Sequence, residues 1–172
     1  AGIWLSLGVS RGLAKGVNLA KAVAIGDLTQ NVTTDADDEI KDLIDAMRVM
    51  SENLNATAGL AYEISQGNLA VQPKPLSDKD TLGLAMRAMT ENLSATAAMA
   101  SEIARGNLAV QPKPLSDKDT LGLAMRAMVE NLNVNAAVAE EIARGNLTVQ
   151  PKPLSDQDTL GVALERMVSL LR

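Results

Sequence analysis

Residues 67–89 read GNLAVQPKPLSDKDTLGLAMRAM, and the same letters return at positions 106–128. A close copy begins at Gly145, so the segment recurs at a constant step from Gly67 to Gly106 to Gly145. A more distant copy starts at Gly26, slightly more than one such step before Gly67. An internal repeat of this kind indicates one supersecondary unit that recurs along the chain. We call the step from Gly67 to Gly106 the repeat period.

Each repeat contains a helix-ending glycine and a proline-rich connector. Apolar residues with helical spacing precede Gly67, which is placed to end that helix. Pro73 and Pro75 then forbid helix and favour an extended path. Because Leu69 and Val71 are apolar, we expect the connector to pack against a helix.

A second helix follows each connector. Ser77 and Asp78 are both suitable N-caps, and Asp80 then lies in the first turn, where the helix dipole favours acids. Neither glycine nor proline occurs between Asn92 and Arg105, so the second helix of one repeat should continue as the first helix of the next. The predicted helices are 3–25, 38–66, 78–105, 117–144 and 157–171.

The length of the connector decides the topology. A stretch of about 11 residues reaches about 36 Å when extended, whereas antiparallel helix neighbours need only about 2–8 residues. We therefore predict two parallel helices joined by a crossing connector. Two helices cannot bury their narrow apolar seams alone, so a second chain is implied. The predicted fold class is all-α, a parallel homodimeric four-helix coiled coil with four stacked helix–connector–helix units per chain.

The composition favours long helices and argues against several functions. The 172 residues include one Trp, one Tyr and no Phe, so Ala, Leu, Met and Val supply most of the apolar content. A net charge of −5 disfavours nucleic acid as a partner, because phosphate binding needs a basic face. Without Cys or His the chain lacks disulfides and the commonest general base and metal ligand. We therefore expect no enzyme activity, no catalytic, cofactor-binding or metal site, and no small-molecule ligand.

The first residues are apolar and the next charged residues are basic. Positions 1–9 read AGIWLSLGV, and Arg11, Lys15 and Lys21 follow before the first acid at Asp27. So short a stretch cannot cross a bilayer, which takes roughly 20 residues. The pattern is typical of the cytoplasmic exit of a membrane helix, so residues 1–10 are interpreted as the end of one. An ordinary helix N-terminus or an expression remnant is the alternative.

An acidic cluster precedes the second predicted helix. It consists of Asp35, Asp37, Asp38 and Glu39. A cation site is one interpretation, but the stretch lacks the glycine and the bidentate glutamate of a calcium loop. We interpret the cluster as a solvated connector followed by a helix N-terminus.

These features resemble the HAMP domain, the relay module of bacterial receptors, sensor kinases, adenylyl cyclases and methyl-accepting chemotaxis proteins. That family shows a glycine that ends the first helix, an apolar residue two positions later, a second connector hydrophobe, and an acidic-Glu-apolar-Gly start to the second helix. The first repeat matches with Gly26-Asp27-Leu28, Val32, Asp38-Glu39-Ile40, Met47, Met50 and Leu54. The resemblance implies a parallel homodimeric four-helix coiled coil, here in four concatenated copies.

The chain departs from the family pattern in three places. The glutamate at the second-helix start is replaced by Thr81 and its equivalents in the later repeats. The second connector hydrophobe falls on Pro73, so either Val71 or Leu76 takes that role. In the first repeat, Gly12 stands where the family often has proline.

The resemblance and the 4-3 spacing of apolar residues define the candidate site residues. The expected relay core is Leu13, Val23, Leu43, Met47, Met50, Leu54, Ile64, Leu82, Met86, Met89, Leu93, Ile103, Leu121, Met125, Met128, Leu132, Ile142, Leu160, Leu164 and Met167. The helix-ending glycines are Gly26, Gly67, Gly106 and Gly145, and the connector hydrophobes are Leu28, Val32, Leu69, Val71, Leu108, Val110, Leu147 and Val149. Counted from the acid that begins the second helix, Met86 and Met89 come one turn earlier than Met47 and Met50.

Each junction between repeats offers two phases for the apolar seam. After Leu93, a three-residue step reaches Thr96 and a four-residue step reaches Ala97. An extra four-residue step locally unwinds a coiled coil. The junction is therefore either a fixed stutter filled by small residues or a joint that rotation switches.

The predicted function is an intracellular signal relay in chemotaxis or two-component signalling. It converts motion of a membrane helix into a packing change that passes to a downstream output domain. The alternative is a passive coiled-coil spacer or dimerisation stalk. The expected partners are a second copy of the chain, an upstream transmembrane or sensor helix, and a downstream kinase-control or methyl-accepting domain of the same chain. The expected location is the cytoplasmic side of the inner membrane, within a membrane-anchored receptor, and the expected units are 11–54, 55–93, 94–132 and 133–172.

Overall fold

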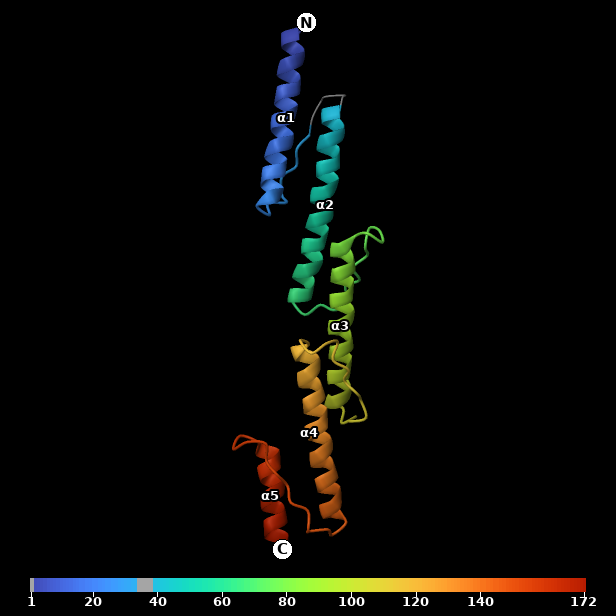
Figure 1. The fold of residues 1–172 in the computed structure, drawn as a ribbon, viewed down its shortest axis with the longest axis vertical. Helices are drawn as coiled ribbons and strands as arrows, with labels where there is room; N and C mark the ends of the chain where they lie inside the picture. The colour runs from blue at the N-terminus through green and yellow to red at the C-terminus, as the bar shows by residue number, and fades with distance from the viewer. Residues whose placement is uncertain (1, 34–38) are drawn as a thin grey trace. The chain divides into compact units, whose positions relative to one another are not determined.

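The chain folds into α-helices joined by extended connectors. The computed structural model describes residues 2–33 and 39–172, and within these ranges it contains five helices and no strand. The helices are α1 (Gly2–Ala24), α2 (Glu39–Ser65), α3 (Thr81–Ala104), α4 (Thr120–Ala143) and α5 (Thr159–Leu171) (Figure 1). The predicted all-α class is confirmed. No helix in the described ranges is long and apolar enough to cross a membrane.

The middle helices run through the repeat junctions without a break. α2, α3 and α4 contain 27, 24 and 24 residues, as expected if each serves two successive repeats. The chain divides into two compact units, Ala1–Glu91 and Asn92–Arg172. Each unit contains two of the four connectors, so each can be described as a pair of repeats.

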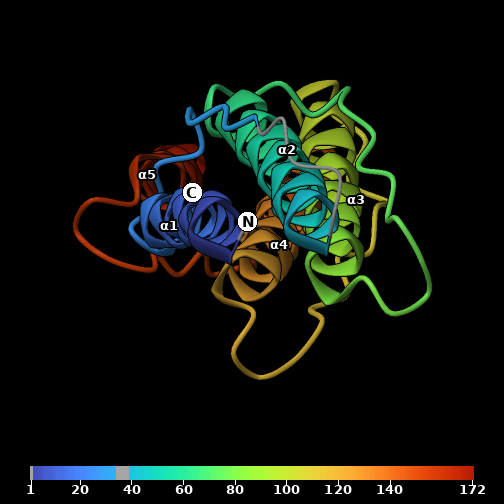
Figure 2. The same cartoon turned by 90° about the horizontal axis from the view of Figure 1, so that it is seen from above.

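Within each unit, helices joined by a connector run in the same direction. α1 and α2 point the same way, and the connector returns beside them (Figure 1). α1 packs directly against α2 in the first unit, and α4 packs directly against α5 in the second. Seen from above, the connector from α2 to α3 passes along the outside of these two helices (Figure 2). The helix pairs therefore have the parallel direction that the connector length predicts.

Each connector begins at a glycine in the left-handed region of backbone space. The φ angle of Gly67 is 83°. Its amide donates to the Ile64 carbonyl at 2.9 Å, and the Asn68 amide donates to the Glu63 carbonyl at 3.0 Å. This Schellman arrangement satisfies carbonyl groups that the helix end leaves unpaired. A side chain is strained at this φ, so the glycine determines where the helix ends. The equivalents with φ between 82° and 84° are Gly26, Gly106 and Gly145.

The second helices of the later repeats begin later than predicted. α3 begins at Thr81 rather than at residue 78, and α4 and α5 are also late. The N-cap is Asp80, whose carboxylate accepts a hydrogen bond from the Gly83 amide at 2.9 Å. The predicted caps Ser77 and Asp78 lie instead in the turn before the helix. Three adjacent capping candidates compete here, and the one that also reaches the connector backbone is used.

The buried positions of the second helices recur with the repeat period. They are Gly83 and Thr90 in α3, Gly122 and Val129 in α4, and Gly161 and Val168 in α5. One period before Gly83 and Thr90 stand Ile44 and Ser51, which are the buried residues of α2. This register aligns Met47 with Met86, although counting from the acid placed them one turn apart.

The connectors pack with only some of their apolar residues. Pro112 is buried and Leu108 and Val110 are half-buried, whereas Leu115 is 69% exposed. One period earlier, Leu76 is exposed in the same way. The sequence left open whether the connector valine or the connector leucine is the second buried hydrophobe of the connector. In the structure, the proline at the family position is the buried residue.

Replacing Leu108 by alanine should lower the free energy of unfolding by about 1–2 kcal/mol. The substitution removes apolar atoms that are half-buried, so only part of the transfer free energy of a leucine side chain is lost. Chemical denaturation of the full chain measures this change. Leu115→Ala in the same connector is the matched control and should change stability by less than about 0.5 kcal/mol. Equal losses from the two variants would contradict the packing of Leu108.

Candidate functional site

Each second helix carries two apolar stripes. In α4 one stripe is buried, and its Val129 lines a small surface cavity together with Leu108 and Pro112 of the connector. The other stripe is open to solvent: Leu121 is 48% exposed, and Met128, two helical turns further on, is 39% exposed. Apolar side chains at this spacing form the seam of a coiled coil. The equivalent exposed pairs are Leu43 and Met50 in α2, Leu82 and Met89 in α3, and Leu160 and Met167 in α5.

The predicted relay core divides between these two stripes. The residues buried within the single chain are Met86, Met125 and Leu164. The half-buried residues are Val23, Met47, Leu54, Ile64, Leu93, Ile103, Leu132 and Ile142. The exposed residues are Leu13, Leu43, Met50, Leu82, Met89, Leu121, Met128, Leu160 and Met167. One chain alone thus leaves nearly half of these predicted core residues uncovered.

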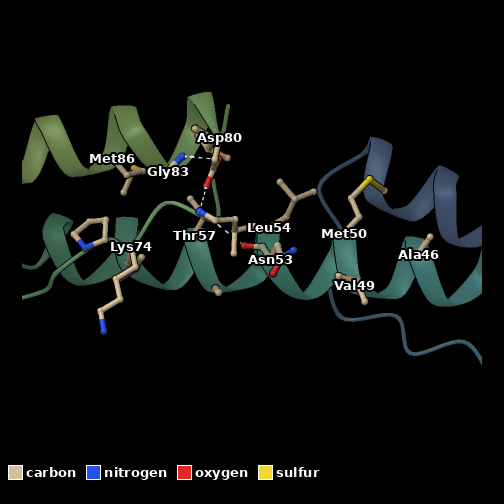
Figure 3. A pocket seen from close by; sticks show the side chains of 15 residues that line it. Ala46, Val49, Met50, Asn53, Leu54, Thr57, Lys74, Asp80, Gly83 and Met86 are labelled. Carbon is tan, nitrogen blue, oxygen red and sulfur yellow. Dashed lines mark hydrogen bonds between the residues drawn. The ribbon is translucent and has the colours of Figure 1, made fainter. Parts of the chain in front are cut away.

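In the first unit, the exposed stripe borders an apolar groove between α2 and α3. The groove has a volume of about 500 Å³, and its lining includes Met50 and Leu54 of α2 (Figure 3). Leu82 and Met86 of α3 line the facing wall, and Pro73 of the connector contributes to the lining. The groove is therefore concave and lined mainly by apolar side chains.

One aspartate in each later repeat joins the connector to the second helix. Asp119 Oδ1 accepts from the Gly122 amide at 2.9 Å, and its Oδ2 accepts from the Leu115 amide at 2.8 Å. The hydrogen bond from Leu115, followed by that from Gly122, holds the pKa of Asp119 below its ordinary value. Asp80 and Asp158 make the same two bonds, and their pKa values are lowered for the same reason. We call this arrangement the aspartate clamp.

The glycine three positions after each clamp aspartate makes room for it. A Cβ on Gly122 would overlap the Asp119 carboxylate and would lie 2.9 Å from Pro114 Cα. Gly83 and Gly161 have the same close neighbours in their own repeats. The Asp-Thr-Leu-Gly sequence therefore works as one unit, in which the aspartate caps the helix and the glycine lets the connector lie against it.

An asparagine organises the start of each later connector. Asn107 Nδ2 donates to Glu102 at 2.9 Å, and its Oδ1 accepts from the Ala109 amide at 3.1 Å. In the first repeat Asp27 has this position and accepts from the Thr29 hydroxyl at 2.7 Å, a bond that lowers the pKa of Asp27. These local side-chain bonds direct the chain out of the helix.

Longer-range donors tie the connectors to the second helices. Asn133 Nδ2 in α4 donates to the Leu108 carbonyl at 3.1 Å. One period later, Arg172 Nε donates to the Leu147 carbonyl at 2.7 Å and its Nη2 donates to the Val149 carbonyl at 3.1 Å. The sequence reasoning missed these donors, because the two residues differ in type and share only their equivalent positions in the repeat.

At the repeat junctions, the residue reached by the three-residue step is the less exposed one. Thr96 is half-buried and donates to the Asn92 carbonyl at 3.0 Å, whereas Ala97 is exposed. Thr57 and Ala58 divide in the same way. Within the single chain, the residue of the three-residue step is thus the one that is partly covered.

The acidic cluster is only partly covered by the structure. Asp35, Asp37 and Asp38 lie outside the described residues, and Glu39 is exposed at the start of α2. Within the described residues, no group of three or more acidic side chains could hold a metal ion.

The aspartate clamps should make the connectors sensitive to acid. A carboxyl group whose pKa is lowered in the folded state stabilises that state above its unfolded pKa of about 3.9, and the effect is lost as pH falls through the lower folded pKa. Hydrogen exchange of the Leu115 amide should therefore accelerate below about pH 4 relative to the Gly67 amide, which bonds a carbonyl. Asp119→Asn should weaken protection of Leu115 already at neutral pH and remove its pH dependence, leaving Leu154 protected. Unchanged protection in this variant would contradict the clamp.

The first repeat matches a known family. Residues 4–56, which include most of α1, the first connector and the first part of α2, match the model of the HAMP domain. Searches of curated proteins and of solved structures found no significant match. HAMP domains are helical coiled-coil modules that link sensor and output parts of receptors and sensor kinases. The chain therefore carries a HAMP domain at residues 4–56, a signalling linker rather than a catalytic module.

Proposed function

We propose that the chain is a tandem array of four HAMP units that acts as a parallel homodimer and relays a signal without catalysis. The units are residues 11–54, 55–93, 94–132 and 133–172, preceded by the end of a membrane helix at 1–10. The observation that carries the proposal is the recurrence of buried positions with the repeat period. Ile44 and Ser51 of the matched segment have equivalents in α3, α4 and α5, although the family model covers residues 4–56 alone.

The exposed stripes support a homodimer. The paired leucine and methionine of each second helix are about 37–48% exposed in the single chain, and two of them, Met50 and Leu82, line the apolar groove of the first unit. Covering apolar surface is favourable by roughly 25 cal/mol per Å². A second copy of the chain, running parallel, would present the same stripe to this surface and complete a four-helix bundle.

The continuous helices suggest how a signal would pass. Input would enter through α1, and each second helix would carry the change onward because it is also the first helix of the next unit. Methionine packs adaptably, which suits a core with more than one arrangement. An input transmits only if it favours one packing over another by a finite free energy. Output would leave through α5, by way of Leu160, Leu164, Met167 and Leu171.

The family match at residues 4–56 supports a proposal for the partners and the location. We place the array on the cytoplasmic side of the inner membrane, between an upstream transmembrane or sensor helix and a downstream output domain of the same chain. A kinase-control or methyl-accepting domain is the output we propose, in chemotaxis or two-component signalling. The functional partner at the helix seam would be the second copy of the chain.

A passive spacer is the second candidate function. It is favoured by the rigid caps, since each later connector has a Schellman end, an asparagine turn and an aspartate clamp. A spacer would keep one packing under all inputs. A relay would exchange between packings at the helix seam while these caps stay intact, so a signalling readout separates the two.

A single introduced cysteine tests the dimer seam. The chain has no native cysteine, so any disulfide must form between introduced residues. Met89→Cys should form disulfide-linked dimers on oxidation, because Met89 belongs to the exposed stripe that would meet its counterpart in the partner. Glu91→Cys is the matched control: the Glu91 side chain is 71% exposed but lies on another face of α3. If both variants crosslink equally well, the seam is misassigned.

Deleting whole repeats tests the relay. If each unit has two packings, a rotation or splaying of the shared helix that favours one packing in a unit also changes the packing of its neighbour. Adjacent units would then adopt opposite packings. Removing residues 68–106 rejoins the chain at equivalent positions and should invert the response of an output domain fused after Arg172. Removing residues 68–145 should restore the original sign.

The measurement is the output of the chimera with and without stimulus. The intact array is the reference, and expression and dimer content of the deletion variants are checked by size and crosslinking. One and two deletions that both keep the sign of the intact chain would rule out alternation and favour the spacer.

A further inference from the structure

Two glycines of α1 face side chains of α2. Gly12 and Gly16 are buried, and a Cβ on Gly12 would lie 2.6 Å from Ile40 Cγ2. A Cβ on Gly16 would lie 3.8 Å from Leu43 Cδ2, which is ordinary van der Waals contact. The Ile40 side chain therefore occupies a notch that exists only because residue 12 has no side chain. We call this contact the Gly12 notch.

The helix pair that contains the notch also buries two large side chains completely. Leu19 of α1 and Ile44 of α2 are the largest fully buried side chains among the described residues. Gly12, Gly16 and Leu19 follow at steps of four and three, so they share one face of α1. Packed protein interiors have few voids, so this face of α1 has little free space in which to shift against α2.

The later repeats have polar residues where the first repeat has the two glycines. Counted back from the helix-ending glycine of each repeat, the positions equivalent to Gly12 and Gly16 are Asn53 and Thr57, Asn92 and Thr96, and Asn131 and Asn135. In the second repeat, Asn53 and Thr57 line the open groove together with Leu82. α4 packs directly against α5 with asparagine at both positions, so that contact contains no equivalent notch.

We propose that the Gly12 notch is a rotational interlock confined to the first repeat. A helix turns by about 100° per residue, so rotating α1 by one residue would bring Arg11 or Leu13 against Ile40 in place of the glycine. α1 therefore cannot turn about its axis without pushing α2. If α1 carries the input, as the proposed function holds, the first repeat couples that input stiffly and the later repeats rearrange.

A double-mutant cycle in the full chain tests the contact. Gly12→Ala should lower Tm by roughly 3–10 °C, because the added methyl group collides with Ile40. Ile40→Ala should also lower Tm, and the variant with both changes should lose clearly less than the sum, since the new methyl group then has room. Additive losses would overturn the interlock.

Two other helical glycines provide matched controls for the same glycine-to-alanine change. Gly16→Ala should alter Tm little, because its Cβ meets Leu43 at contact distance. No atom of the described residues lies within 4 Å of a Cβ placed on Gly59, so Gly59→Ala should leave Tm unchanged or raise it, since alanine is the better helix former. A loss in Gly59→Ala as large as that in Gly12→Ala would also overturn the proposal.

Spin labels on the exposed residues Asn18 of α1 and Asp42 of α2 report rotation directly. In the native chain, diluted with unlabelled copies, the distance between the labels should be narrowly distributed. Ile40→Ala should broaden the distribution because α1 is then free to turn, and Gly12→Ala should shift it. Distributions that are the same in all three proteins would contradict the interlock.

The outcomes separate the interlock from the relay. Non-additive Tm losses at Gly12 and Ile40, together with an output chimera that does not respond to the stimulus, would contradict the relay and support the interlock. A chimera that responds to the stimulus, together with additive Tm losses and unchanged distances between the spin labels, would contradict the interlock and support the relay.

Discussion

The parallel course of successive helices depends on anchoring the connector at both of its ends. An extended segment that runs back along a helix presents backbone groups that need hydrogen-bond partners. At its start, the left-handed glycine and the following asparagine satisfy the last turn of the first helix. At its end, the clamp aspartate accepts amides from the connector and from the second helix at once. The prolines between these anchors have no amide to satisfy, which reduces the number of partners the connector requires.

This anchoring gives every second helix two different apolar faces. One face is covered within the chain, where Val129 lies beside Leu108 and Pro112 of the connector. The other face, represented by Leu121 and Met128, is left open. A single chain therefore pairs the polar groups at both ends of its connectors but leaves the apolar seams of its helices exposed. That division explains how the repeat can be locally rigid and still leave an apolar helix face uncovered in the single chain.

The repeats share this plan but differ at the places where helices meet. The first repeat has Gly12 and Gly16 against Ile40 and Leu43, so its two helices interlock closely. The second repeat has larger polar residues at the same positions, and a groove separates its helices. If α1 carries the input, a close first repeat followed by a more open second one would pass a motion of α1 to α2 before any seam rearranges. The family match at residues 4–56 falls on the interlocked repeat.

Features that arise from local chemistry could be predicted from the amino-acid sequence. Helix periodicity, the glycine before each connector and the absence of breakers at the 92–105 junction were enough for the all-α class, the C-terminal ends of the helices and their continuity through the junctions. The same reasoning predicts that the connector leucines are buried against the helices, and Leu108 is half-buried in the single chain.

Tertiary structure decided the features that depend on residues distant in the chain. Ser77, Asp78 and Asp80 are all good caps, and the last was selected because its carboxylate also reaches the Leu76 amide. The register that pairs Ile44 with Gly83 became visible only from burial, since the first connector differs in length from the others. The Gly12 notch required knowing that Ile40, which lies beyond the first connector in the sequence, packs against it. Local propensity cannot rank such alternatives, because their free-energy differences come from contacts that exist only once the helices have packed.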